Sequence, residues 1–186
     1  MHRIALYLFL IATVVLPVGA APLFVGPFDI GNWTFATEGT GSVNLLNAPD
    51  SITLFGSDCG SPTCPAEQPI TTFEVVYGGP DPIVFTFPWL YFTDDDNAGF
   101  DPFGYFLNDT FVELTDPGLG DQSGVTSVPL VAGDRFGFFI STTDNRFGRA
   151  SADIGATSAA VPEPAAFLFM GSGLALIGLS RRILGR

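Results

Sequence analysis

The sequence predicts an all-β protein, an antiparallel β-sandwich of jelly-roll type with about 8–10 strands. Three observations support this class. Between residues 31 and 157, short runs alternate apolar and polar side chains, as strands with one buried face do. Clusters of Gly, Pro, Asp and Asn separate these runs at intervals of roughly 8–14 residues. No long window of this region has the 3.6-residue apolar period of a helix, so helices there should be short or absent.

Ten segments fit the strand pattern. The alternation is clearest where Phe, Val, Ile and Tyr occupy every second position. The 19 phenylalanines of the chain predict an aromatic-rich core. The expected strands are residues 33–35, 43–45, 52–54, 73–77, 83–87, 103–107, 111–114, 125–130, 136–140 and 150–157.

The N-terminus predicts a secretory signal helix at residues 1–21. His2 and Arg3 form a short basic region, residues 4–16 are uncharged and mostly apolar, and small residues follow before Ala21. The expected partners of this segment are the Sec translocon and signal peptidase. The sandwich domain is then expected at residues 22–157, followed by a short linker at 158–161.

The C-terminus carries a compact set of signals at residues 162–186. Pro162, Glu163 and Pro164 precede a 15-residue uncharged run at 165–179, and Arg181 and Arg182 follow it. The prolines keep the approach extended, and the arginines are typical of the cytoplasmic side of a membrane helix. The run is shorter than the roughly 20 residues of a stable spanning helix, so the predicted transmembrane helix is short.

This order of tripeptide, apolar run and basic tail resembles the PEP-CTERM sorting signal of Gram-negative bacteria. The resemblance implies export, an inner-membrane intermediate, and recognition by an exosortase-type sorting enzyme near Pro162, Glu163 and Pro164. It further implies a cell-surface or extracellular matrix protein of bacteria that make exopolysaccharide. A plain C-terminal anchor that is never cut is the alternative, and it too places the body outside the cytoplasm.

The charge of the expected exported body excludes several classes of function. Of the 19 acidic residues 18 lie at positions 21–160 against three arginines, which gives a formal charge of −15. Such a field repels nucleic acid and anionic polysaccharide and attracts divalent cations. The single histidine is His2 and the chain has no lysine, which excludes His-based triads, His-ligated zinc and Schiff-base lysine in the body. We therefore expect a protein that is not an enzyme, although catalysis by carboxylates alone stays open.

Cys59 and Cys64 are separated by Gly, Ser, Pro and Thr. In an exported chain this close spacing predicts a local disulfide. The loop is small, so its contribution to the free energy of unfolding should be at the low end of about 2–4 kcal/mol. A metal site is a weaker alternative, because two sulfurs without a further Cys or His make a poor site.

An acidic loop is the best candidate for a ligand site. Asp94, Asp95 and Asp96 stand together, Asp101 follows, and Asp144 lies in a later loop that could reach the same end of the sandwich. Calcium prefers six to eight oxygen ligands, so this set is a candidate calcium site. The spacing does not fit an EF-hand, and a solvated acidic loop is the alternative.

Two further sets of residues are candidates for polysaccharide chemistry. Trp89 and Tyr91, beside the acidic loop, are candidates for stacking on sugar rings if they are exposed. Glu38, Glu74 and Glu113 could in principle supply a carboxylate pair for glycoside cleavage. Glu74 and Glu113 each lie among alternating apolar neighbours, which favours an outward, solvated position.

The body also resembles the small jelly-roll domains that precede this sorting signal, with a looser similarity to a CUB-type sandwich. The matching segments are residues 101–105, 121–124, 132–138 and 141–145. The resemblance implies an adhesion or recognition module. We expect an exported, surface-sorted matrix or biofilm protein with a binding, adhesion or structural role. The alternative is a small carboxylate-dependent glycoside hydrolase that acts on exopolysaccharide.

Overall fold

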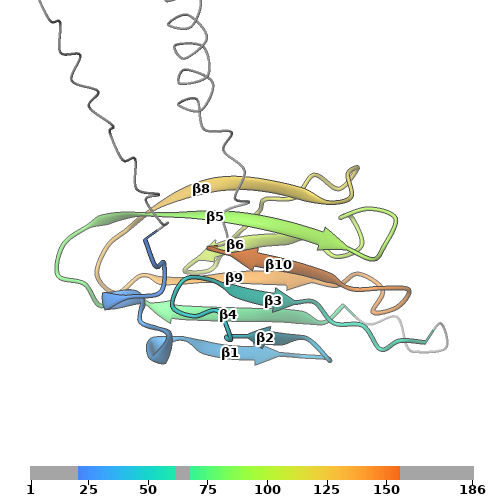
Figure 1. Cartoon of the computed structure of the whole chain (residues 1–186), viewed down its shortest axis with the longest axis horizontal. Helices are drawn as coiled ribbons and strands as arrows, with labels where there is room; N and C mark the ends of the chain where they lie inside the picture. The colour runs from blue at the N-terminus through green and yellow to red at the C-terminus, as the bar shows by residue number, and fades with distance from the viewer. Residues whose placement is uncertain (1–20, 62–67, 156–186) are drawn as a thin grey trace, which may run out of the picture.

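A computed structural model describes residues 21–61 and 68–155 of the chain. These residues form two five-stranded antiparallel sheets, as the sequence predicts, with two short 3₁₀ turns (Figure 1). The turns are η1 (Gly26–Phe28) and η2 (Ile30–Asn32). The strands are β1 (Thr34–Thr37), β2 (Ser42–Asn44), β3 (Ile52–Phe55), β4 (Ile70–Val76), β5 (Ile83–Thr93), β6 (Phe103–Leu107), β7 (Thr110–Glu113), β8 (Gln122–Leu130), β9 (Arg135–Ser141) and β10 (Ala150–Ile154).

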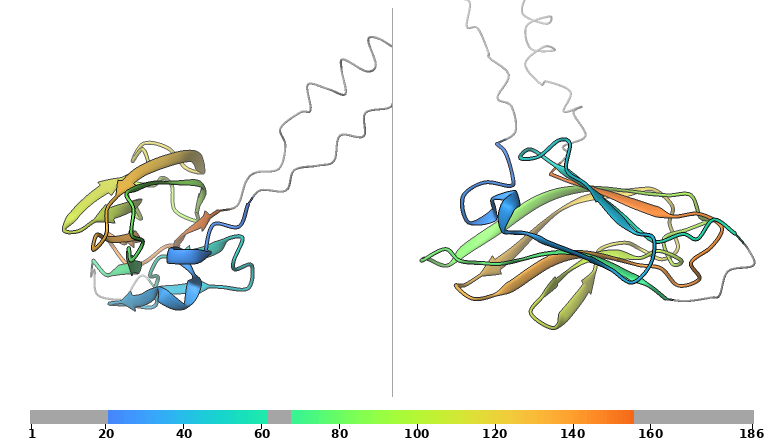
Figure 2. Two further views of the ribbon diagram at one scale, coloured as in Figure 1. Left: turned by 90° about the vertical axis from the view of Figure 1, so that its left-hand side faces the viewer. Right: turned by 90° about the horizontal axis from the view of Figure 1, so that it is seen from below.

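The strand order is that of a jelly roll with two added strands. One sheet has the order β1-β4-β9-β6-β7, and the other has the order β2-β3-β10-β5-β8. From β3 onward the chain crosses between the sheets at every step except the β6–β7 hairpin, so eight strands form the double Greek key. Strands β1 and β2 extend one edge of each sheet. The strands run along the long axis of the domain, and the loops gather at its two ends (Figure 2).

Aromatic side chains fill the space between the sheets. Trp33 lies parallel to Phe138 with ring centroids 5.6 Å apart, and Phe87 meets Phe138 edge-on at 5.0 Å. Phe136 contacts Phe138, Phe85 and Tyr105 in the same cluster. Edge-to-face and stacked contacts of this kind are the arrangements that aromatic rings favour. The predicted aromatic-rich core is confirmed.

The segment before β1 closes one end of this core. Phe24 packs edge-on against Trp33, and Phe28 stacks on Tyr77. The Trp33 indole N–H donates to the carbonyl oxygen of Phe28 at 2.9 Å, so the buried ring has a partner for its polar atom. The 3₁₀ turns therefore belong to the folded domain.

Strand β5 is longer than the sequence pattern predicts. The expected strand ended at residue 87, yet β5 continues through Pro88 to Thr93. The Pro88 carbonyl accepts a hydrogen bond from Gly155 N, one residue beyond the end of β10. A residue's N–H and C=O point to the same side of an antiparallel strand, so the missing N–H of Pro88 faces a position where β10 has ended. The proline therefore leaves the pairing of β5 with residues 150–154 of β10 intact.

Glycines stand opposite large aromatic rings at three positions in the sheets. The cross-strand pairs are Trp89 with Gly124, Phe106 with Gly137, and Phe139 with Gly104. In each pair a Cβ on the glycine would lie within 3 Å of the opposing ring. Each ring thus occupies the space that the glycine leaves, which specifies the strand register.

Gly137→Ala is expected to destabilise the protein by about 1–3 kcal/mol, the usual cost of overpacking. The new methyl group would lie 2.5 Å from the Phe106 ring and 2.8 Å from Glu74 Cβ. Gly78→Ala is the matched control, because a Cβ there meets no atom within 4 Å. Equilibrium urea unfolding of both variants measures the difference, and equal midpoints would contradict this account of the register.

The predicted signal helix, the linker and the short C-terminal helix at 165–179 lie outside the described residues. Within residues 21–61 and 68–155, no helix has the length and hydrophobicity needed to span a bilayer.

Candidate functional site

Four loops meet at the end of the sandwich where β5 finishes. Residues 94–102 connect β5 to β6, and residues 142–149 connect β9 to β10. Phe100 O accepts hydrogen bonds from both Thr143 N (2.7 Å) and Thr143 Oγ1 (2.9 Å), which joins these two loops. Cys59 N donates to Asn145 O at 3.1 Å, and Ala98 N donates to Leu119 O at 2.7 Å. The acidic loop and Asp144 therefore share one end of the domain, as the candidate calcium site requires.

Asp101 is the most unusual side chain at this end. It is 0% exposed, and neither of its carboxylate oxygens receives a hydrogen bond from the described residues. The hydroxyl of Thr142 lies nearby, but it donates its proton to Ser57 O at 3.1 Å. Buried polar atoms are normally hydrogen-bonded, because burial without a partner costs about 1–3 kcal/mol or more. Asp101 therefore lacks a partner that its position requires.

The carboxyl group of Asp95 faces that of Asp101. Burial raises the pKa of Asp101 to about 7, and the charges of Asp95 and Asp144 add to this effect. Burial also raises the pKa of Asp95, as do the charges of Asp144, Asp58 and Asp96. Asp95 Oδ2 is likewise buried without a hydrogen-bond partner. Three of the four oxygens of these two facing carboxyl groups are thus buried without a hydrogen-bond donor.

An open cavity of about 420 Å³ lies over this end of the domain. Its lining consists of Asp94, Asp95, Asp96, Phe100, Asp144 and Phe147. Asp94 and Asp96 are exposed, while Asp95 and Asp144 are partly buried. No set of three or more His, Cys, Asp or Glu side chains within residues 21–61 and 68–155 has an arrangement that could hold a metal ion. Of the five predicted ligands, the structure brings Asp95 and Asp101 together and places the others around them.

Phe100 and Phe147 form an aromatic rim that sequence analysis missed. Phe147 is 66% exposed and has a φ of 68°, in the left-handed region. This conformation is unusual for a bulky residue and costs roughly 1–2 kcal/mol. The cavity therefore combines carboxylates with exposed aromatic surface.

The expectation that Trp89 and Tyr91 are exposed is wrong. Trp89 is 6% exposed and Tyr91 is 0% exposed. Both lie on the inner face of β5 against Phe103, because β5 continues through Pro88 with alternate side chains pointing into the core. The Trp89 indole N–H donates to Thr126 Oγ1, and the Tyr91 hydroxyl donates to Asp101 O. Neither ring is available for a sugar.

Cys59 lies in the loop between β3 and β4, at the same end of the domain. Its sulfur is 3.6 Å from the carbonyl oxygen of Ser61. Cys64 lies outside the described residues, so the disulfide stays a prediction. Asp58, beside Cys59, contributes to the negative field around Asp95. Its position could not be read from the sequence, because nothing there places this loop beside the acidic one.

The glutamates proposed for glycoside cleavage are scattered. Glu38 is exposed between β1 and β2, and Glu113 is exposed on β7. Glu74, on β4, is paired with Arg135 at 3.2 Å. Strands β4 and β7 are three strand spacings apart, or about 14 Å, which exceeds the roughly 5–9.5 Å between the carboxyl groups of glycosidases.

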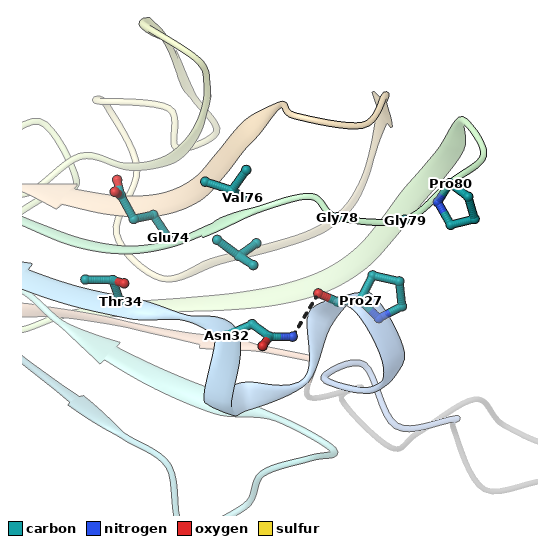
Figure 3. Close-up of a pocket in the computed structure, with 9 residues that line it drawn as sticks. Pro27, Asn32, Thr34, Glu74, Val76, Gly78, Gly79 and Pro80 are labelled. Atoms are coloured by element: carbon teal, nitrogen blue, oxygen red, sulfur yellow. Dashed lines mark hydrogen bonds between the residues drawn. The ribbon is translucent and has the colours of Figure 1, made fainter.

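A second cavity, of about 480 Å³, lies at the opposite end of β4 (Figure 3). It is lined by the Pro27 and Asn32 region, Glu74, Val76 and the turn at Gly78–Pro80. The Asn32 amide donates to Pro27 O at 3.4 Å, and Glu74 is held by Arg135. The side chains of Asn32 and Glu74 already have partners, so it is the weaker candidate for a ligand site.

The fold and the cavity define a small jelly roll with an acidic, aromatic-rimmed loop end. Residues 160–182 match the PEP-CTERM protein-sorting motif, which confirms the resemblance seen at Pro162, Glu163 and Pro164. The motif implies processing by an exosortase, a sorting enzyme. It therefore implies an exported protein that is held in the membrane and then sorted to the surface. No curated protein matches the chain.

Solved structures give only distant similarity. A β-glucosidase from Kluyveromyces marxianus in complex with glucose is 14% identical with a TM-score of 0.29, over 55% of this chain and 13% of that one. A family 35 carbohydrate-binding module from Clostridium thermocellum is 9% identical with a TM-score of 0.28, over 67% and 99%. An isomalto-dextranase from Arthrobacter globiformis T6 complexed with panose is 16% identical with a TM-score of 0.29, over 67% and 23%. The chain thus spans a small part of the two enzymes.

Proposed function

We propose that the protein is a surface-sorted component of an extracellular matrix or biofilm that binds neutral glycans through the cavity at its acidic loop end. The sorting motif supports the location. The observation that carries the binding role is Phe147, a large apolar side chain held exposed at the rim of an acidic cavity.

The position of Phe147 has two energetic costs. Its left-handed backbone is unfavourable, and its exposed ring leaves apolar surface in water. Strained residues of this kind gather at functional sites, and a ligand that covers the ring would recover the cost of its exposure. Aromatic faces beside hydrogen-bond acceptors suit a sugar ring, which has apolar C–H faces and hydroxyl donors at its edge.

The negative charge of the cavity favours neutral glycans over anionic ones. Asp94, Asp96 and Asp144 line it, and the body as a whole has an expected formal charge of −15. Like-charge repulsion disfavours uronic acids and sulfated sugars, whereas carboxylates accept hydrogen bonds from the hydroxyls of neutral sugars. The expected ligand is therefore a neutral polysaccharide.

Binding without hydrolysis fits the arrangement of carboxyl groups better than catalysis does. Glu74 and Glu113 are too far apart for a glycosidase pair. Asp95 and Asp101 face each other directly, which leaves no room for a glycosidic bond between them. The body also has no histidine or lysine.

Phe147→Ala is expected to weaken retention on a dextran matrix by about 2- to 13-fold, because a lost aromatic contact is worth roughly 0.5–1.5 kcal/mol. Affinity electrophoresis in gels containing dextran, with alginate as the anionic comparison, measures the change. Leu46→Ala is the control, since Leu46 is 88% exposed in the loop between β2 and β3, away from this cavity. Equal retention of both variants, or stronger binding to alginate, would contradict the proposal.

A further inference from the structure

The meeting of Asp95 and Asp101 presents a chemical problem that the glycan role does not explain. Both carboxyl groups are turned toward one another, and three of their four oxygens are buried without a hydrogen-bond donor. Two carboxylates in contact repel each other unless a positive charge lies between them. A shared proton or a bound cation can supply that charge, because none of the described residues donates a hydrogen bond to these three oxygens.

We propose that Asp95 and Asp101 hold a divalent cation, most suitably calcium, which joins the β5–β6 loop to the β9–β10 loop. Asp101 supplies a buried carboxylate aimed into the site, and Asp95 supplies the facing one. Asp144, across the cavity on the second loop, completes the negative field. The remaining ligands are backbone carbonyls and water, which calcium accepts readily.

The neighbouring side chains agree with a cation rather than a proton alone. Asp58 and Asp96 act electrostatically on Asp95 in addition to Asp144, so several negative charges converge on the pair. One shared proton neutralises one unit of charge, whereas calcium neutralises two. The oxygen-only environment also favours calcium over zinc, which prefers nitrogen and sulfur.

A site with two direct carboxylates should bind weakly. Extracellular calcium modules bind at about 10⁻⁴–10⁻³ M, where the ion is abundant outside cells. Magnesium needs near-ideal octahedral geometry and gives up its water reluctantly, so it should substitute poorly. The bound cation would then link and stabilise the two loops that carry Phe100 and Phe147.

The test is thermal unfolding of the full chain in detergent at pH 7.5, first in EDTA and then with 10 mM calcium. At 10 to 100 times the dissociation constant, calcium should raise Tm by about 3–10 °C. Asp101→Asn and Asp95→Asn should lose this shift. In EDTA the Asp101→Asn variant should be at least as stable as the unchanged protein, because its amide can donate to Asp95.

Controls separate specific binding from general screening of a strongly acidic protein. Asp81→Asn removes one exposed charge at the opposite end of the domain and should keep the calcium shift. Magnesium at 10 mM and NaCl at equal ionic strength should give a smaller shift than calcium. No calcium shift, or an equal shift in Asp101→Asn, would overturn the proposal in favour of a shared proton.

Terbium offers a second readout that does not depend on thermal stability. The ion replaces calcium and emits light when an aromatic ring nearby is excited, and the Tyr91 hydroxyl donates to Asp101 O at 3.0 Å. Sensitised emission should appear on terbium addition, fall on calcium addition, and be lost in Asp95→Asn. Emission that persists in that variant would contradict the site. Dextran retention tests the glycan role separately, so failure of one proposal can be told from failure of the other.

Discussion

Replacing Pro162, Glu163 and Pro164 with alanine is expected to hold the protein in the inner membrane with Arg186 still attached. The motif at 160–182 implies that an exosortase recognises this segment, and alanine removes both prolines and the only charged residue that the motif has ahead of the apolar run. In a host with the sorting machinery, intact mass and membrane fractionation should show a near-complete change. The unaltered protein should appear in outer fractions without its C-terminal arginines.

Ser158→Ala provides the control for that experiment, since it lies just before the matched residues. It should be processed like the unaltered protein. Normal processing of the triple-alanine variant would contradict sorting through this tripeptide and favour a plain anchor at 165–179.

Phe138→Ala should destabilise the domain by about 3–5 kcal/mol, a large part of the roughly 5–15 kcal/mol that stabilises a typical domain. Phe138 is fully buried, and its ring contacts Trp33, Phe87 and Phe136, so truncation opens a cavity between the sheets. Urea unfolding followed by tryptophan fluorescence measures the loss, because Trp33 stacks directly on the ring.

Phe92→Ala tests whether this cost depends on burial. Phe92 is 45% exposed on the outer face of β5, so its removal should change the free energy of unfolding by only about 0.5 kcal/mol. A similar loss in both variants would show that the core is not organised around Phe138.

The alternation of apolar side chains was enough to predict the sandwich and its ten strands. Segments such as residues 73–77 and 136–140 correspond closely to β4 and β9, because a period of two is dictated by the pleat itself. The length of β5 could not be predicted, because the tolerance of Pro88 depends on where β10 ends, and β10 lies 60 residues further along the chain. This error also led to the wrong expectation for Trp89 and Tyr91.

The candidate site was predicted in part. Loop positions allowed Asp95, Asp101 and Asp144 to be grouped, because loops that alternate in an antiparallel fold return to the same end. Two features had no signal in the sequence. The burial of Asp101 depends on how distant parts of the chain pack, and the left-handed conformation of Phe147 is one that a bulky residue rarely adopts.

The direction of β10 determines where the chain leaves the domain relative to the acidic loops. The strand starts at Ala150, beside the acidic loops, and runs away from them to Ile154 and Gly155 (Figure 2). About five residues of strand separate Gly155 from the loop end, a distance of roughly 16 Å. Gly155 donates a hydrogen bond to Pro88 O, at the middle of β5, so it lies midway along the domain and clear of the cavity. A molecule tethered through the residues that follow Gly155 would therefore not have its acidic loop end at the point of attachment.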